Sequence, residues 1–194
     1  MAEVKINRRL NLVLSIEGEK GRVHVHSVPI SRSVFEDNWL VISRTLSATY
    51  MNKLGPVMGP RVAALALRDE AKEMGIWEGV QNSLLQEIKR LTNVIVPSER
   101  GWETLPYGEA IKRGWLDEDQ VAEVENSLVY FTCASWMHPR EQFITVMDGM
   151  RTLWGAQTTS SNVTEYQRSL PISMPVETTG EKPNSEEKPS FKAA

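Results

Sequence analysis

Hydrophobic and polar positions alternate in two short runs close to the start of the sequence. The apolar side of the first run consists of Leu10, Leu12, Leu14 and Ile16. The second run, residues 22–28, places Val23 and Val25 opposite His24 and His26. Strict alternation is typical of a β-strand, and the short connection with Gly18 and Gly21 is typical of a hairpin turn. We therefore predict a β-hairpin at residues 10–30 whose apolar face must pack on the rest of the protein, since an isolated hairpin is marginal in water.

Beyond the hairpin the hydrophobic period changes to three or four residues, which is typical of amphipathic helices. A first helix over residues 33–55 is predicted from a capping-box pattern, Ser33 with Glu36. Its apolar stripe is Phe35, Trp39, Ile42, Leu46 and Tyr50. The segment GPVMGP (55–60) is predicted to be a rigid turn, with Pro60 in the first turn of a helix that ends near Gly75.

The next apolar stripe predicts a helix that ends before Pro97. It consists of Leu84, Ile88, Leu91 and Ile95. Residues 98–116 have a mixed pattern, which indicates a loop with one short helix between Pro106 and Gly114. Asp117 and Gln120 form a second capping-box pattern ahead of a helix that reaches residue 138. A helix that Gly155 closes and a weaker helix within residues 161–170 complete the pattern.

These elements predict a mainly α fold, in which the N-terminal β-hairpin packs on a compact bundle of about five to six helices. The length of 194 residues fits one domain better than two. We expect an N-terminal arm at residues 1–9 and a single domain at residues 10–170. Residues 171–194 contain four of the ten prolines and one aromatic residue, Phe191. Such a segment cannot bury enough apolar surface to order itself, so it is predicted to be a disordered, flexible tail.

Charge and composition remove several classes of function. The net charge of −3 supplies no basic surface for nucleic acid, so we expect no nucleic-acid partner. A single cysteine excludes an internal disulfide, and no apolar run is long enough to span a membrane. The start of the chain lacks the cleavage site of a signal peptide. We expect an intracellular protein that binds no membrane and no cofactor.

His24 and His26 raise the question of a metal site, because an H-x-H pair on a strand places both imidazoles on one face. Zinc needs at least one further ligand, and the neighbour on that face is Arg22, a cation. A zinc enzyme that adds His138 remains an alternative. The preferred interpretation is a solvated or partner-facing surface of the hairpin.

Two other candidate sites have structural explanations. Cys133 lies in the apolar stretch VYFTCASW, where a free cysteine is usually a buried hydrophobic residue. The acidic stretch DEDQVAEVE (117–125) stabilises the start of a helix through the helix dipole. Neither pattern predicts catalysis, and we expect a protein that is not an enzyme.

Three tryptophans, Trp77, Trp102 and Trp115, lie next to glycines in predicted loops. Aromatic side chains at such places either hold a loop against the core or anchor a partner protein. The residues that we select as candidate partner contacts are Trp77, Trp102, Tyr107, Trp115, His24 and His26.

The order of the segments resembles that of the tail assembly chaperones of long-tailed, siphovirus-type bacteriophages, across residues 10–170. The nearest likenesses are VPIS followed by VFE (28–36) and LWGAQTTSSNVTEY (153–166). The resemblance implies a non-enzymatic chaperone in the host cytoplasm that binds the tape measure protein and promotes tail tube assembly. It also implies that the major tail tube protein is recruited, and that a ribosomal frameshift extends the chain from its C-terminal tail.

Other classes of function stay open at this point. A minor tail or head–tail connector protein of the virion would have a similarly small, acidic, helical chain. Self-association is a further expectation, which the sequence does not test.

Overall fold

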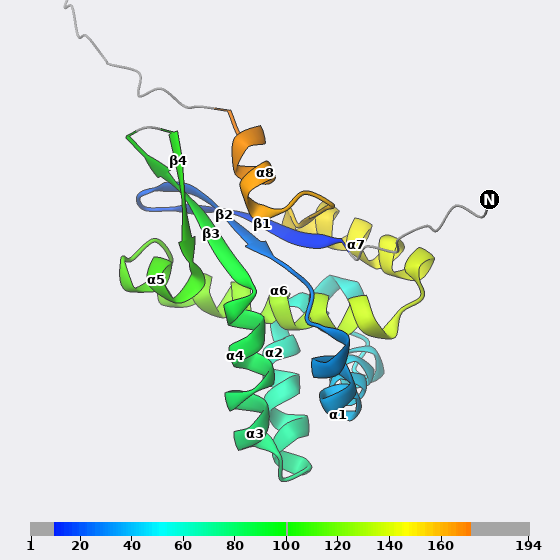
Figure 1. Cartoon of the computed structure of the whole chain (residues 1–194). Coiled ribbons are helices and arrows are strands. Elements are labelled where there is room, and N and C mark those ends of the chain that lie inside the picture. The colour runs from blue at the N-terminus through cyan, green and yellow to red at the C-terminus, as the bar shows by residue number, and fades with distance from the viewer. Residues whose placement is uncertain (1–9, 100, 172–194) are drawn as a thin grey trace, which may run out of the picture.

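The alternating residues near the start of the chain fold into an antiparallel hairpin of β1 (Asn11–Gly18) and β2 (Gly21–Ser27), closed by the pair Gly18 and Gly21. A computed structural model describes residues 10–99 and 101–171 (Figure 1). The predicted N-terminal arm, residues 1–9, lies outside the described residues. So do residues 172–194 of the predicted tail.

The prediction of a mainly α fold with a lone hairpin is wrong. In the described part of the chain, the hairpin is the centre of a five-stranded antiparallel sheet with the order β4-β3-β2-β1-β5. The three further strands are β3 (Thr92–Ser98), β4 (Gly101–Pro106) and β5 (Gln157–Thr159). The fold is therefore of the mixed α/β class, and the hairpin is stabilised by strands that the sequence pattern did not reveal.

Strand β3 replaces the second half of a predicted helix. The helix α4 (Leu84–Arg90) ends two residues after Ile88. Ile95 therefore lies in strand β3 and does not continue the helical stripe. Thr92 marks the change, because its hydroxyl donates to the carbonyl of Ile88 at 2.8 Å and accepts from the Ser27 hydroxyl, whose oxygen lies 2.9 Å away. The following residues, NVIV, are rich in β-branched side chains, which favour strands.

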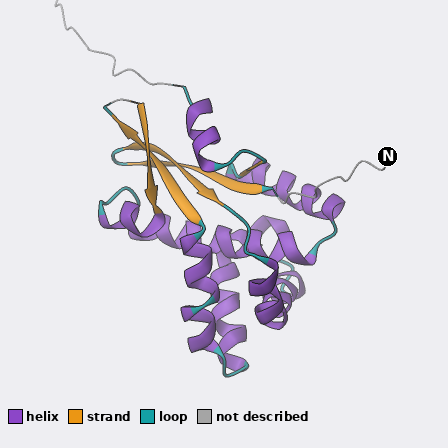
Figure 2. Cartoon of the chain, viewed as in Figure 1, coloured by secondary structure: helices purple, strands orange, loops and turns teal. Residues whose placement is uncertain are grey.

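The helices are α1 (Arg32–Met51), α2 (Gly55–Glu73), α3 (Trp77–Asn82), α4, α5 (Tyr107–Lys112), α6 (Glu118–Met137), α7 (Arg140–Trp154) and α8 (Val163–Ser169). Figure 2 shows them on both sides of the sheet, with α8 on one side and α6 on the other. Helices α1 and α2 pack on α6 from the side that faces away from the sheet. The long helix α6 is thus the centre of the molecule.

Several helix boundaries agree with the sequence. Asp117 caps α6 in a complete capping box with Gln120, and Gly155 ends α7 in the left-handed conformation at φ 63°. Helix α5 lies between Pro106 and Gly114, as predicted. The weak helix within residues 161–170 is α8, which starts with a capping box of Asn162 and Glu165.

Other boundaries differ from the prediction. Helix α1 is capped by Ser31, whose hydroxyl accepts from the Val34 amide, and not by Ser33. GPVMGP is not a turn but the first two turns of α2, with Pro60 inside the helix. The predicted stripe of α1 is also shifted, since Trp39 and Tyr50 are exposed.

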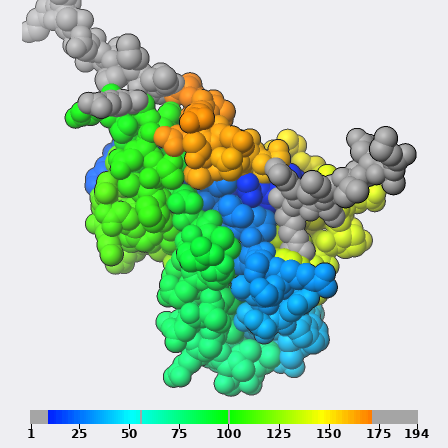
Figure 3. Space-filling model, viewed as in Figure 1, coloured from blue at the N-terminus to red at the C-terminus, as the bar shows by residue number. Residues whose placement is uncertain are grey.

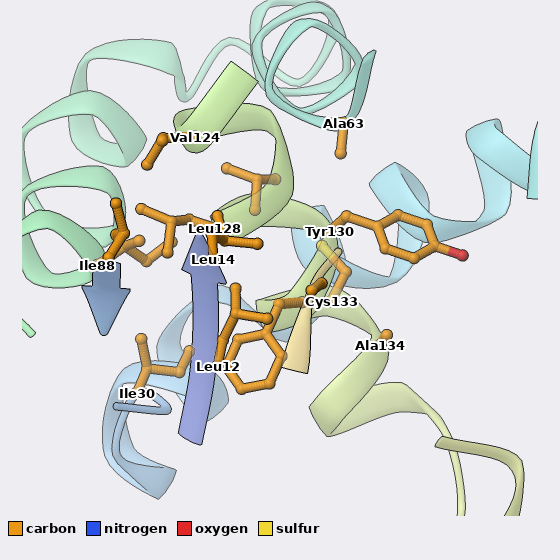
Figure 4. Close-up of a cluster of buried hydrophobic side chains, with 14 of the residues drawn as sticks. Leu12, Leu14, Ile30, Ala63, Ile88, Val124, Leu128, Tyr130, Cys133 and Ala134 are labelled. Carbon is orange, nitrogen blue, oxygen red and sulfur yellow. The ribbon is translucent and has the colours of Figure 1, made fainter. Parts of the chain in front are cut away.

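The core lies between α6 and one face of the sheet (Figure 4). Leu12 and Leu14 of β1 meet Leu128 of α6 there, all nearly free of solvent exposure. On the other side of α6, the ring of Tyr130 points away from these strands, and it packs against Gly59 of α2. An ideal Cβ on Gly59 would lie 2.5 Å from that ring, so only glycine allows α2 to approach α6 this closely.

Candidate functional site

The histidine face of the hairpin is covered by the C-terminal strap, which we define as residues 161–171. His24 is 7% exposed and His26 is fully buried, so the predicted solvated surface is wrong. The hairpin buries both of its faces, since Val23 and Val25 on the opposite face are buried as well. Figure 3 shows the covering helix α8, in orange, lying across the strands.

Polar contacts hold the strap on the sheet. The Ser161 carbonyl accepts from Asn11 Nδ2 at 2.9 Å and lies 3.0 Å from His26 Nε2. The Gln167 side chain accepts from the Thr104 hydroxyl at 2.8 Å and donates to the Trp102 carbonyl. A helix as short as α8 is unstable alone in water, and α8 has no buried residue. The strap therefore keeps its place through the sheet, and not through a core of its own.

Both imidazoles are in surroundings that disfavour their charged form. Burial lowers the pKa of His24 below its ordinary 6.5, Arg22 lowers it further, and Glu17 opposes the shift. Burial also lowers the pKa of His26, against the hydrogen bond with Ser161. Because a carbonyl only accepts, His26 donates from Nε2, and its Nδ1 has no hydrogen-bond partner among the described atoms. Neutral histidines suit this site.

Aromatic rings complete the histidine face. The rings of His24 and Trp102 meet edge-on at 5.3 Å between centroids, and Tyr166 of α8 lies 6.0 Å from each histidine. The Trp102 indole also donates to the Pro171 carbonyl at 2.9 Å. Among the predicted partner contacts, the structure thus brings together His24, His26 and Trp102, beneath or against the strap.

The remaining predicted contacts lie apart from this cluster. Tyr107 is 1% exposed in the core, so a partner cannot reach it in this structure. Trp115 is half-buried, with the ammonium of Lys20 5.6 Å from its ring. The prediction that Trp77 lies in a loop is wrong. Trp77 is the first residue of α3 and is half-buried against the core.

The exposed apolar surface lies mainly elsewhere, on α1 and α2. Its members are Trp39, Leu40, Tyr50, Met51, Val57, Met58 and Leu65. The sequence pattern assigned two of them, Trp39 and Tyr50, to the core. The helical spacing of Trp39 and Tyr50 predicted that they are buried. In the structure, α1 buries Thr45 and Thr49 in the core instead. Each of these threonines satisfies its hydroxyl on a carbonyl of its own helix, at 2.7 Å.

Leu65 lies between two hollows and lines both of them. We define the α2 face as Leu65 together with the residues that line these two hollows. One hollow, of about 290 Å³, lies between α1 and α2 and includes Ala48, Leu54 and Ala66. The other, of about 270 Å³, lies between α2 and the α3–α4 segment and includes Trp77 and Leu85. A hydrophobic groove between helices is a place where the apolar side of another helix can bind. The α2 face has a shape that suits a helical partner.

Chemical groups for catalysis are sparse in the described residues. They contain no group of three or more His, Cys, Asp or Glu side chains that could hold a metal ion. Burial raises the pKa of the Cys133 thiol to about 12, so this thiol stays protonated at neutral pH. In the described ranges, none of the helices is of the length and apolarity that crossing a membrane requires.

Comparison of the chain with protein-family models, with curated proteins and with solved structures finds no match.

Proposed function

We propose that this chain is a non-enzymatic tail assembly chaperone of a long-tailed bacteriophage, which binds the tape measure protein in the host cytoplasm. The resemblance of residues 28–36 and 153–166 to such chaperones supplies the partner. The observation that carries a protein-binding role is the α2 face, where Leu65 is 46% exposed between two hollows.

Amphipathic helices commonly bind by laying their apolar side into a hydrophobic groove. The α1–α2 hollow offers leucine, valine and alanine side chains on its walls and Asp69 and Glu70 at one end. Long hydrophobic helices need such a surface to stay soluble before they assemble. A tape measure protein consists of helices of this kind, so its apolar faces are the proposed ligands of the α2 face.

Recruitment of the major tail tube protein and production of a longer, frameshifted form belong to the same proposal. Both rest on the resemblance alone. The longer form would continue from the C-terminal tail, which leaves the described structure at Pro171, beside Trp102 on the strap side of the sheet.

Co-expression with the tape measure protein tests the proposal. We expect the tape measure protein to become soluble and to copurify with the wild-type chain. Leu65→Glu places a charge between the two hollows and should abolish copurification, whereas Leu153→Glu, at a residue of α7 that is 50% exposed and lines neither hollow, should not. A tape measure protein that stays insoluble with the wild-type chain would contradict the proposal.

A further inference from the structure

A hollow of about 280 Å³ lies between α7 and β5, beside the start of β1 (Figure 1). Leu10, the residue that precedes β1, forms part of its wall. The apolar side chains that α7 contributes to the hollow are those of Phe143, Ile144 and Met147. The segment of the chain that leads into Leu10 therefore meets the described structure at the rim of this hollow.

The surface of the hollow combines a buried floor with one exposed apolar side chain. Phe143 and Met147 are nearly free of solvent exposure, whereas Ile144 is 42% exposed beside them. Burial of such a side chain is favourable, because it removes apolar area from water. The hollow thus suits a segment that brings apolar side chains against Ile144.

The alternating pattern of β1 continues into the residues before it. Leu12 is buried in the core, and Leu10, two residues earlier, faces the hollow on the same side of the strand. Counting back by two residues at a time puts Ile6 and Val4 on the side of Leu10. Lys5 falls on the opposite side. The preceding segment therefore offers apolar side chains on the side that faces the hollow.

Arg8 is the charged residue on that side, between Ile6 and Leu10. The hollow contains a carboxylate for it, Asp148, whose side chain is 60% exposed and whose Oδ1 lies 3.2 Å from Nη2 of Arg151. An exposed carboxylate can accept from a second cation, although such a pair adds little stability. The hollow thus accommodates Arg8, while the apolar contacts supply the favourable free energy.

The length of the segment matches that of the hollow. Four residues separate Leu10 from Ile6, and an extended chain covers about 13 Å over that interval. On α7, the lining residues Ile144 and Arg151 are seven residues apart, which is about 10 Å along a helix. Ile6 of the same chain can therefore reach the whole length of the hollow.

We propose that residues 4–9 lie in this hollow of their own chain, with Ile6 and Val4 against Ile144 and with Arg8 near Asp148. The inference does not depend on the proposed function, since the hollow shares no lining residue with the α2 face. An experiment on the chain alone, without the tape measure protein, is therefore sufficient to test it.

Thiol labelling of the full chain tests the inference. Cys133→Ala removes the native thiol, and Ile144→Cys then places a single thiol in the hollow. Ile6→Asp should increase the labelling rate of this thiol by about tenfold or more, because it removes the apolar contact that keeps the segment in place. Asn7→Asp adds the same charge to the other side of the segment and should leave the rate unchanged.

Leu153→Cys, in the same Cys133→Ala background, is the matched control on α7. This residue is exposed and does not line the hollow, so Ile6→Asp should not alter its labelling rate. An unchanged labelling rate of Ile144→Cys after Ile6→Asp would overturn the inference. Protection that is lost on dilution would also overturn it, since the covering segment would then belong to a second copy.

Discussion

The Nε2 atom of His26 in the second strand lies 3.0 Å from the carbonyl oxygen of Ser161, 135 residues later in the sequence. This contact joins the centre of the sheet to the start of the C-terminal strap. It exists in a setting that lowers the pKa of both His24 and His26. The attachment of the strap and the protonation of the histidines are therefore linked.

The first prediction concerns acid pH. Since both histidines have a lower pKa in the folded chain than in the unfolded chain, the unfolded state binds more protons below about pH 6.5. Their contribution to the free energy of unfolding is complete above that pH and is lost as the pH falls toward the folded values. Urea unfolding between pH 7.5 and 4.5 should show this loss.

Histidine variants check the cause of the acid effect. The double variant His24→Gln/His26→Gln should flatten the dependence of the unfolding free energy on pH, whatever its stability at pH 7.5. Equal slopes for the double variant and the wild type would show that the buried pair does not cause the effect.

The second prediction concerns the cap of α8. Asn162 accepts from the Glu165 amide at 2.9 Å, and Asn162→Ala should cost about 1 kcal/mol of helix stability. Because α8 has no buried residue, the loss should stay local. Amide hydrogen exchange should become about fivefold faster in residues 163–169 with little change in the melting temperature.

Asp117→Ala is the matched comparison for the α8 cap. This variant removes the same kind of N-cap from α6. In the wild type, the Asp117 side chain accepts from the Gln120 amide at 2.8 Å. Since α6 is the centre of the core, this variant should lower the melting temperature of the whole protein. An equal fall for Asn162→Ala would mean that the strap is part of the cooperative core.

The third prediction concerns the contact between Gly59 and Tyr130. Gly59→Ala should destabilise the protein by about 1–3 kcal/mol, because the added methyl group would overlap the fully buried ring of Tyr130. Gly79→Ala, in helix α3 with open space at its Cβ, should be neutral or stabilising by about 0.5–1 kcal/mol. Chemical denaturation measures both, and equal effects of the two variants would refute the close approach.

The fourth prediction concerns the only cysteine. The buried Cys133 thiol, with its pKa raised to about 12, should react with a thiol reagent at pH 8 at least about 100-fold more slowly in the native protein than in urea. Ser33→Cys adds an exposed thiol to helix α1 and should react at once. Rapid modification of Cys133 in the native chain would show that the core opens easily.

Local sequence signals predicted the elements whose cause is local. The hairpin follows from alternation and from the glycines of its turn, and the start of α6 follows from Asp117 and Gln120. Gly155 ends α7 for the same reason that glycine ends many helices, its access to positive φ. In each case a few neighbouring residues determine the backbone.

Contacts between distant segments explain what the sequence did not predict. Leu84, Ile88, Leu91 and Ile95 keep a helical spacing, yet the last of them joins a strand because β2 offers a pairing edge for β3. The burial of His24 and His26 depends on the strap, whose polar contacts leave no hydrophobic period in the sequence. Alternation assigns a residue to a face, but only the tertiary structure determines what covers that face.

Hydrogen exchange of the chain in complex with the tape measure protein tests the central proposal most directly. The proposal predicts a stable complex in which α1 and α2 residues that line the α2 face, around Ala48 and Leu65, gain protection relative to the free chain. Protection confined to other surfaces, or no complex at all, would contradict the assignment of the α2 face as the binding site of a tail assembly chaperone.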